Sequence, residues 1–204
     1  MTLTEHGSSV APDATAAVTV ASLARDWAQR APNQVAMREK DFGIWHEHTW
    51  AETWAMIEDA AFGLLALGVR PGDRVSIHSE DRPEWIVLDL ATVAVRGITV
   101  GFYPTNPMAE VAYLLGDCGA CVHFAEDQEQ FDKVAGIDRA AIPNLRTILF
   151  VEPRGMLGVE DDRLLFWDSF LELGREYRRS HPNEVAERMA AARGDDVMTL
   201  VYTS

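Results

Sequence analysis

Apolar residues recur along this chain at two spacings, one typical of helices and one typical of buried strands. The clearest helix is predicted over 49–67, whose apolar stripe consists of Trp54, Ile57, Ala61, Leu64 and Leu65. Thr49 and Glu52 have the spacing of a capping box at its start. Gly68 suits the left-handed position that ends a helix.

Short apolar runs and helical periods alternate through the rest of the chain. Helices are predicted over 18–29, 83–95, 106–118, 126–134, 164–179 and 182–193, and strands over 74–78, 98–103, 120–125, 146–151 and 197–202. Asp81 is expected to cap the helix over 83–95, with Glu84 three residues on. In the first helix Val20, Leu23, Ala24 and Trp27 share one face.

This alternation predicts the fold class. Strand–helix–strand repetition with buried strands implies right-handed crossovers and an α/β fold, a mostly parallel, doubly wound sheet flanked by helices. Ligands of such sheets bind at the carboxyl ends of the strands.

A hairpin is predicted ahead of the alternating region. Strands over 34–40 and 44–49 are joined through Asp41-Phe42-Gly43, with Gly43 at positive φ. His46 and His48 alternate and so share one face of the second strand. They fit either a metal pair or the exposed polar face of a hairpin, and we favour the polar face.

The N-terminal residues lack periodicity. We expect a disordered tail over 1–16 and one folded domain over 17–204. The tail has no Lys or Arg and no long apolar run, so it does not resemble a secretory signal. The most apolar run, 85–95, is interrupted by Asp89 and is shorter than the roughly 20 residues of a membrane span. We predict a cytoplasmic protein and leave peripheral membrane contact and oligomeric state open.

Charge narrows the partners. The 204 residues carry a formal net charge of −14 with 48% hydrophobic residues, which suits a folded acidic domain. Such a surface repels phosphate backbones and argues against nucleic acid. It would also repel small phosphate-bearing ligands at long range, so backbone N–H groups, a metal ion or a local basic patch would have to hold them.

Two groups of residues allow a functional and a structural interpretation. Cys118 and Cys121 are spaced as C-x-x-C, and we favour buried structural thiols over a redox or zinc site. Five arginines gather near the end of the chain and could attract CoA phosphates or an anionic membrane. We favour a solvated helix face on which they pair with Glu172, Glu176, Glu184 and Glu187; the arginines are Arg175, Arg178, Arg179, Arg188 and Arg193.

The chain ends on an apolar strand that runs into Tyr202-Thr203-Ser204. Small hydroxyl residues after a buried strand can donate O–H and N–H groups to phosphate oxygens. The run DDVMTLVYTS at 195–204 resembles the approach to the signature of the adenylate-forming (AMP-binding) superfamily, Thr-Ser-Gly-Thr-Thr-Gly-x-Pro-Lys-Gly.

Other tracts strengthen this resemblance over about 18–204. LGVRPGDRV at 67–75 is similar to an early passage of the superfamily. Four further tracts resemble segments of the long-chain fatty-acyl-CoA synthetases within that superfamily: RPEW at 82–85, YPTNP at 103–107, EVAYLL at 110–115 and FWDSF at 166–170. Asp81 replaces a common Asn, and Gly101 replaces a common Pro.

The resemblance implies an acid–thiol ligase of the AMP-forming type. Such an enzyme uses ATP, Mg²⁺ and CoA to convert a carboxylic acid, here a long-chain fatty acid, into acyl-adenylate and then acyl-CoA. Thr203 and Ser204 would contact ATP, while Tyr202 packs at the strand end. No catalytic or metal-ligating residue is assigned.

Two alternatives stay open. The acid could be aryl, short-chain or a carrier-linked amino acid, or the chain could be a nonenzymatic doubly wound module that binds a nucleotide or a partner. The resemblance implies an incomplete N-terminal part of the large adenylation domain, truncated inside the phosphate-binding motif. The chain alone is then expected to be inactive.

Overall fold

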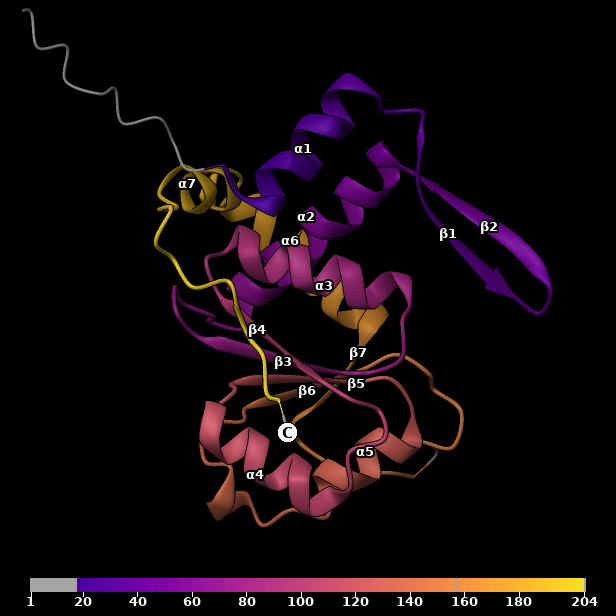
Figure 1. Cartoon of the computed structure of the whole chain (residues 1–204), viewed down its shortest axis with the longest axis vertical. Coiled ribbons are helices and arrows are strands. Elements are labelled where there is room, and N and C mark those ends of the chain that lie inside the picture. The colour runs from indigo at the N-terminus through magenta and orange to yellow at the C-terminus, as the bar shows by residue number, and fades with distance from the viewer. Residues whose placement is uncertain (1–17, 157, 204) are drawn as a thin grey trace, which may run out of the picture.

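The computed structural model describes residues 18–156 and 158–203 (Figure 1). The expected tail over 1–16 and Ser204 therefore lie outside the described residues. A central sheet separates two helical layers. One layer holds α1 (Val20–Arg30), α2 (Trp50–Ala66), α3 (Pro83–Ala94), α6 (Trp167–Ser180) and α7 (Glu184–Ala190); the other holds α4 (Met108–Cys118) and α5 (Gln128–Ala135).

The sheet is parallel throughout and confirms the predicted fold class. Its order is β7-β6-β5-β3-β4-β8. The strands are β3 (Arg74–His78), β4 (Ile98–Phe102), β5 (Val122–Ala125), β6 (Thr147–Phe150), β7 (Leu164–Phe166) and β8 (Thr199–Leu200). Because α3 and α4 cover opposite faces (Figure 1), the loops after β3 and β4 leave the carboxyl edge in opposite directions. Such a divergence is where ligands of doubly wound sheets bind.

A separate hairpin, β1 (Val35–Asp41) and β2 (Ile44–Thr49), projects from the helical layer (Figure 1). Gly43 has φ +84°, as predicted, and Phe42 before it has φ +45°. Two successive positive φ values match the twist of a two-residue hairpin loop. His46 is exposed and lies opposite Glu39, which agrees with the exposed polar face.

Helix α2 has the ends that its sequence predicts. The hydroxyl of Thr49 accepts the Glu52 N–H at 3.3 Å, and the Glu52 carboxylate accepts the Thr49 N–H at 2.9 Å. Gly68 follows the helix with φ +75°. This reciprocal cap satisfies donors that helix geometry leaves unpaired.

The predicted cap of α3 is wrong by one residue. Arg82, not Asp81, is the N-cap, with φ −148° and ψ 162° and no side-chain cap bond. Pro83 explains the difference, because a proline suits the first helical position and holds the residue before it in an extended conformation. Arg82 instead donates from Nε to the Glu84 carboxylate at 2.6 Å.

Three other predictions need correction. Leu164–Phe166 is strand β7 rather than the start of a helix, because it pairs with 148–150 of β6. β8 covers only Thr199–Leu200 of the predicted strand over 197–202, since Val201 points into solvent. The predicted helix over 182–193 is shorter, as α7.

The face that α1 buries also differs from the prediction. Ala21 and Ala24 face the core, whereas Val20, Leu23 and Trp27 stay 39%, 48% and 49% exposed. Small side chains let α1 approach the neighbouring helices closely. Trp27 instead stacks on the Trp50 ring, with centroids 5.9 Å apart.

Buried apolar side chains form one core on each face of the sheet. Cys118 and Cys121 are free and buried, and burial raises the pKa of both thiols. This confirms the structural interpretation. Across 18–156 and 158–203, no helix is long and apolar enough to cross a membrane.

Candidate functional site

The carboxyl ends of β3, β4 and β8 lie along one edge of the sheet, and the segment after β8 reaches this edge. Thr203 lies there in a pocket of about 470 Å³. The pocket is lined by Gly101, Tyr103, Asn106, Glu110, Tyr113, Leu114, Tyr202 and Thr203. Of the two residues predicted to contact ATP, the structure thus places Thr203 at the edge where ligands of such sheets bind.

Few bonds hold the strand that leads to Thr203. The Thr99 N–H donates to the Met198 carbonyl at 2.9 Å, and the Thr199 hydroxyl donates to the Thr99 carbonyl at 3.0 Å. Downstream, the Tyr202 hydroxyl donates to the Asp117 carboxylate at 2.6 Å. Burial and this hydrogen bond raise the pKa of Tyr202. Tyr202, two residues past the end of β8, packs against the core below.

Asn106 is the residue of this pocket that our sequence prediction missed. It is only 7% exposed, and its Oδ1 has no hydrogen-bond partner in the structure. A buried acceptor without a donor is costly, so a rotation of the Asn106 amide that gave this oxygen a donor would be favoured. Tyr103 and Tyr113 line the same pocket, 70% and 63% exposed. The sequence feature that could have identified Asn106 is its position in the tract YPTNP at 103–107.

A second pocket, of about 450 Å³, lies on the other side of the β4 end. It is lined by residues 79–81, Trp85, 101–104 and 199–201. Gly101 and Tyr103 line both pockets. A methyl group at Gly101 would contact only the Trp85 ring, at 3.6 Å. A glycine at the position of the common Pro therefore leaves room for a small side chain.

Glu126 orders the loop that borders the second pocket. Its carboxylate accepts the Glu80 N–H at 2.7 Å and an Arg82 N–H at 3.3 Å. Arg82 also binds Glu84, and the Lys133 ammonium lies 2.9 Å from Glu129. These two cations are therefore paired. A phosphate group at this edge would depend on N–H and O–H donors, or on a cation that arrives with it.

Two buried histidines lie beneath the edge. His78 ends β3, and its ring centroid is 5.6 Å from that of His123. Burial, assisted by the charge of Lys133, lowers the pKa of His78 to about 4. Burial also keeps the pKa of His123 well below its usual value. Both imidazoles are thus neutral near pH 7, and the edge gains no positive charge from them.

Four of the five clustered arginines, namely Arg175, Arg178, Arg188 and Arg193, pair with carboxylates, and two of these pairs use the predicted glutamates. Arg175 lies 3.1 Å from Glu172, and Arg188 lies 3.1 Å from Glu184, as the spacing predicts. Arg178 instead reaches across to Glu58 of α2, at 2.7 Å. Within the described ranges, no group of three or more His, Cys, Asp or Glu residues could hold a metal ion.

Comparisons with known proteins agree with this arrangement. The family model described as AMP-binding enzyme matches residues 24–204. The long-chain-fatty-acid–CoA ligase FadD15 of Mycobacterium tuberculosis is 35% identical over 185 residues, which are 91% of this chain and 29% of that protein. A 3-[(3aS,4S,7aS)-7a-methyl-1,5-dioxo-octahydro-1H-inden-4-yl]propanoyl:CoA ligase of the same organism is 32% identical, over 85% of this chain and 31% of its own length.

A solved structure shows the same fold. A Mycobacterium tuberculosis fatty acyl CoA synthetase superposes with a TM-score of 0.67 at 20% identity, over 90% of this chain and 32% of that chain. The present chain spans less than a third of the length of each of these three relatives.

Proposed function

The chain belongs to the AMP-binding enzyme family, and we propose from this premise that the whole protein activates a carboxylic acid with ATP and transfers the acyl group to CoA. The acid carboxylate attacks the α-phosphorus of ATP, which gives an acyl-adenylate and releases pyrophosphate. The CoA thiol then attacks the activated carbonyl, which gives a thioester and releases AMP. Family membership argues against a nonenzymatic module.

The position of Thr203 is the structural observation that supports this proposal. Its hydroxyl and N–H lie at the carboxyl edge of the parallel sheet, where a phosphate chain can approach. We propose that Thr203 and the neighbouring Ser204 donate to phosphate oxygens. The pocket also fits a nucleotide-containing substrate, because the exposed rings of Tyr103 and Tyr113 offer surfaces for stacking.

Mg²⁺ would supply the charge compensation that an acidic surface cannot. The triphosphate and the acid are both negatively charged and must be brought together. Arg82 and Lys133 are already paired to carboxylates, so their charge is not free to offset this repulsion. Mg²⁺ is commonly held by substrate phosphates with one or two carboxylates, so a three-residue cluster in this chain is not required. We propose that it enters with ATP.

For the acid, we propose a medium- to long-chain fatty acid. Support comes from the similarity to the long-chain-fatty-acid–CoA ligase FadD15 and from the RPEW and YPTNP tracts. The 32% identical ligase named for a fused-ring propanoate shows that similar chains serve other acids. An aryl, short-chain or carrier-linked amino acid is therefore the alternative.

A substrate screen tests the reaction and the acid together. The whole protein is incubated with ATP, Mg²⁺, CoA and single acids, and pyrophosphate and acyl-CoA are measured. We expect kcat/KM to be highest for fatty acids of medium to long chain. A preference for benzoate-like or amino acids would overturn the acid assignment, and the absence of acid-dependent pyrophosphate would overturn the reaction.

A further inference from the structure

Arg96 has a backbone conformation that arginine rarely adopts. It follows α3 with φ +63°. Its N–H donates to the Val93 carbonyl at 3.0 Å, and the Gly97 N–H donates to the Thr92 carbonyl at 2.8 Å. These two bonds define a Schellman motif, in which glycine is the usual left-handed residue.

Helix α2 ends in the same motif with the expected glycine. The Gly68 N–H donates to Leu65 at 2.9 Å, the Val69 N–H donates to Leu64 at 3.0 Å, and Gly68 has φ +75°. A side chain in this region carries a steric cost that glycine avoids. Arginine at the end of α3 is thus unfavourable for the local backbone, and its contribution must come from the side chain.

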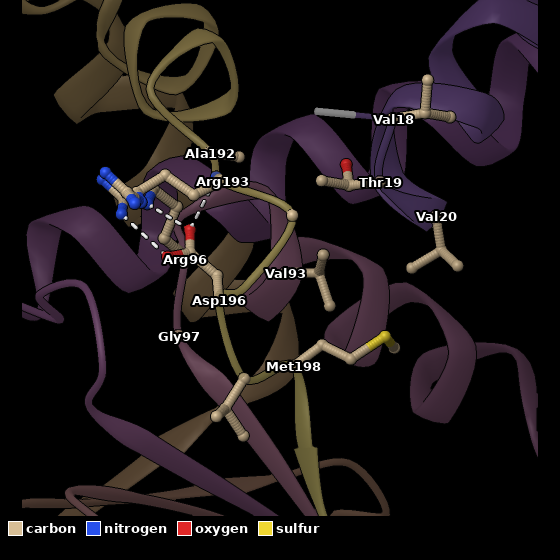
Figure 2. A pocket seen from close by; sticks show the side chains of 12 residues that line it. Val18, Thr19, Val20, Val93, Arg96, Gly97, Ala192, Arg193, Asp196 and Met198 are labelled. Atoms are coloured by element: carbon tan, nitrogen blue, oxygen red, sulfur yellow. Dashed lines mark hydrogen bonds and ion pairs between the residues drawn. The ribbon is translucent and has the colours of Figure 1, made fainter. Parts of the chain in front are cut away.

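The Arg96 side chain forms two hydrogen bonds with Asp196. Arg96 Nε and Nη2 donate to the two carboxylate oxygens of Asp196 at 2.8 and 3.1 Å (Figure 2). The Arg193 N–H donates to the same carboxylate at 3.0 Å. The Arg96 and Asp196 side chains are only 21% and 31% exposed. A pair joined by two parallel bonds is stronger than a surface ion pair joined by one.

Asp196 stands just before the weakest strand of the sheet. β8 has two residues, and among the described residues it pairs only with β4 and forms one edge of the sheet. After it, the chain runs free of β4 to Tyr202, which is anchored on Asp117. The segment over 196–203 is therefore held at both ends by side chains, with little backbone pairing between them.

We propose that Arg96 is a positioning residue whose ion pair with Asp196 holds β8 in register and thereby places Thr203 at the carboxyl edge. The expected consequence for ATP rests on the proposed function above. The structural part concerns the chain alone and is tested separately.

Amide hydrogen exchange of residues 1–204, at a protein concentration where sedimentation velocity shows the monomer, measures the anchor directly. R96G suits the test, because glycine relieves the backbone strain while removing the guanidinium. We expect exchange of the Thr99 amide, which donates to the Met198 carbonyl between β4 and β8, to accelerate about fivefold to tenfold in R96G and D196N, as loss of one good ion pair allows. R96K should restore part of the protection, because lysine keeps the charge without the planar fork.

The matched control is D195N. Asp195 pairs with the exposed Arg193 side chain at 3.0 Å and does not contact Arg96. This variant should exchange like the wild type, and the R96G D196N double variant should be no faster than either single variant. Unchanged exchange of the Thr99 amide in R96G would overturn the proposal.

Kinetics of the whole protein test the consequence. In R96G we expect KM for ATP to rise about tenfold with kcat changed less than threefold, and R96K to fall between R96G and wild type. Unchanged KM beside faster exchange would refute the link to ATP while the anchor stands. A wild-type protein without acid-dependent pyrophosphate release would refute the proposed function instead, and the exchange result would still decide the anchor.

Discussion

At the residue scale, the buried polar groups under the carboxyl edge show how burial controls charge. His78 is fully buried, and neither ring nitrogen has a hydrogen-bond partner in the structure. Protonation would place a charge among the rings of Phe102 and His123. The folded state therefore holds this imidazole neutral, and acid should weaken the fold.

The pH dependence of His78 follows from the direction of its shift. Its pKa falls from 6.5 to about 4 on folding, so the unfolded chain binds the proton more tightly. The contribution of neutral His78 to the free energy of unfolding is fully present above pH 6.5 and is lost as the pH falls towards about 4. Between about pH 7 and pH 4.5 the loss should be about 2 kcal/mol.

Urea unfolding of wild type and H78L at both pH values tests this assignment. Carboxylates contribute equally to both proteins, so the difference between the two curves isolates His78. H78L should lose less stability on acidification by about 2 kcal/mol. Parallel pH curves for the two proteins would show that His78 does not carry the effect.

At the element scale, the contact between α2 and α6 depends on glycine. A Cβ on Gly174 would overlap the Asp59 carbonyl of α2, and one on Gly63 would overlap the Phe170 ring of α6. The two helices can therefore lie closer than any larger residue would permit. Arg175 to Asp59 and Arg178 to Glu58, both at 2.7 Å, add ion pairs along the same contact.

We expect G174A to destabilise the fold by roughly 1–3 kcal/mol, because the obstacle is backbone and cannot rotate away. G194A is the matched control, since a Cβ there meets nothing within 4 Å and Gly194 does not have a positive φ. Thermal and urea unfolding of both variants give the comparison. Equal stability of G174A and G194A would contradict this account of the helix contact.

At the scale of the whole molecule, we expect the 204-residue chain by itself not to catalyse adenylation. A triphosphate needs several convergent donors, and the predicted phosphate contacts here are Thr203 and Ser204 alone. Purified residues 1–204 with ATP, Mg²⁺, a fatty acid and CoA should release no pyrophosphate above the blank. Turnover above the blank would show that the chemistry lies elsewhere in these residues.

The side of the sheet that β8 forms should promote self-association. Val201, just past β8, is 74% exposed, and β8 has a neighbour on one side only. An unpaired apolar edge can pair with another copy. Sedimentation velocity should show association of residues 1–204 that V201K reduces and I44K, at the exposed hairpin, leaves unchanged. Equal association in V201K and wild type would exclude this edge.

The sequence by itself determined the order and type of most elements, the parallel sheet and the position of Thr203 after its last strand. These features depend on local physics. Side-chain period distinguishes helix from strand, Thr49 and Gly68 mark helix ends, and a strand followed by a crossover helix favours a parallel partner.

Only the tertiary structure decided what distant segments do to one another. Leu164–Phe166 became β7 because β6 was available to pair with it, and α1 buried Ala21 and Ala24 because neighbouring helices required close approach. The ion pair between Arg96 and Asp196 and the burial of Asn106 depend on contacts between distant segments, which the spacing of apolar residues along the chain does not predict. Local spacing specifies an element, but its partner depends on which surfaces the folded chain brings together.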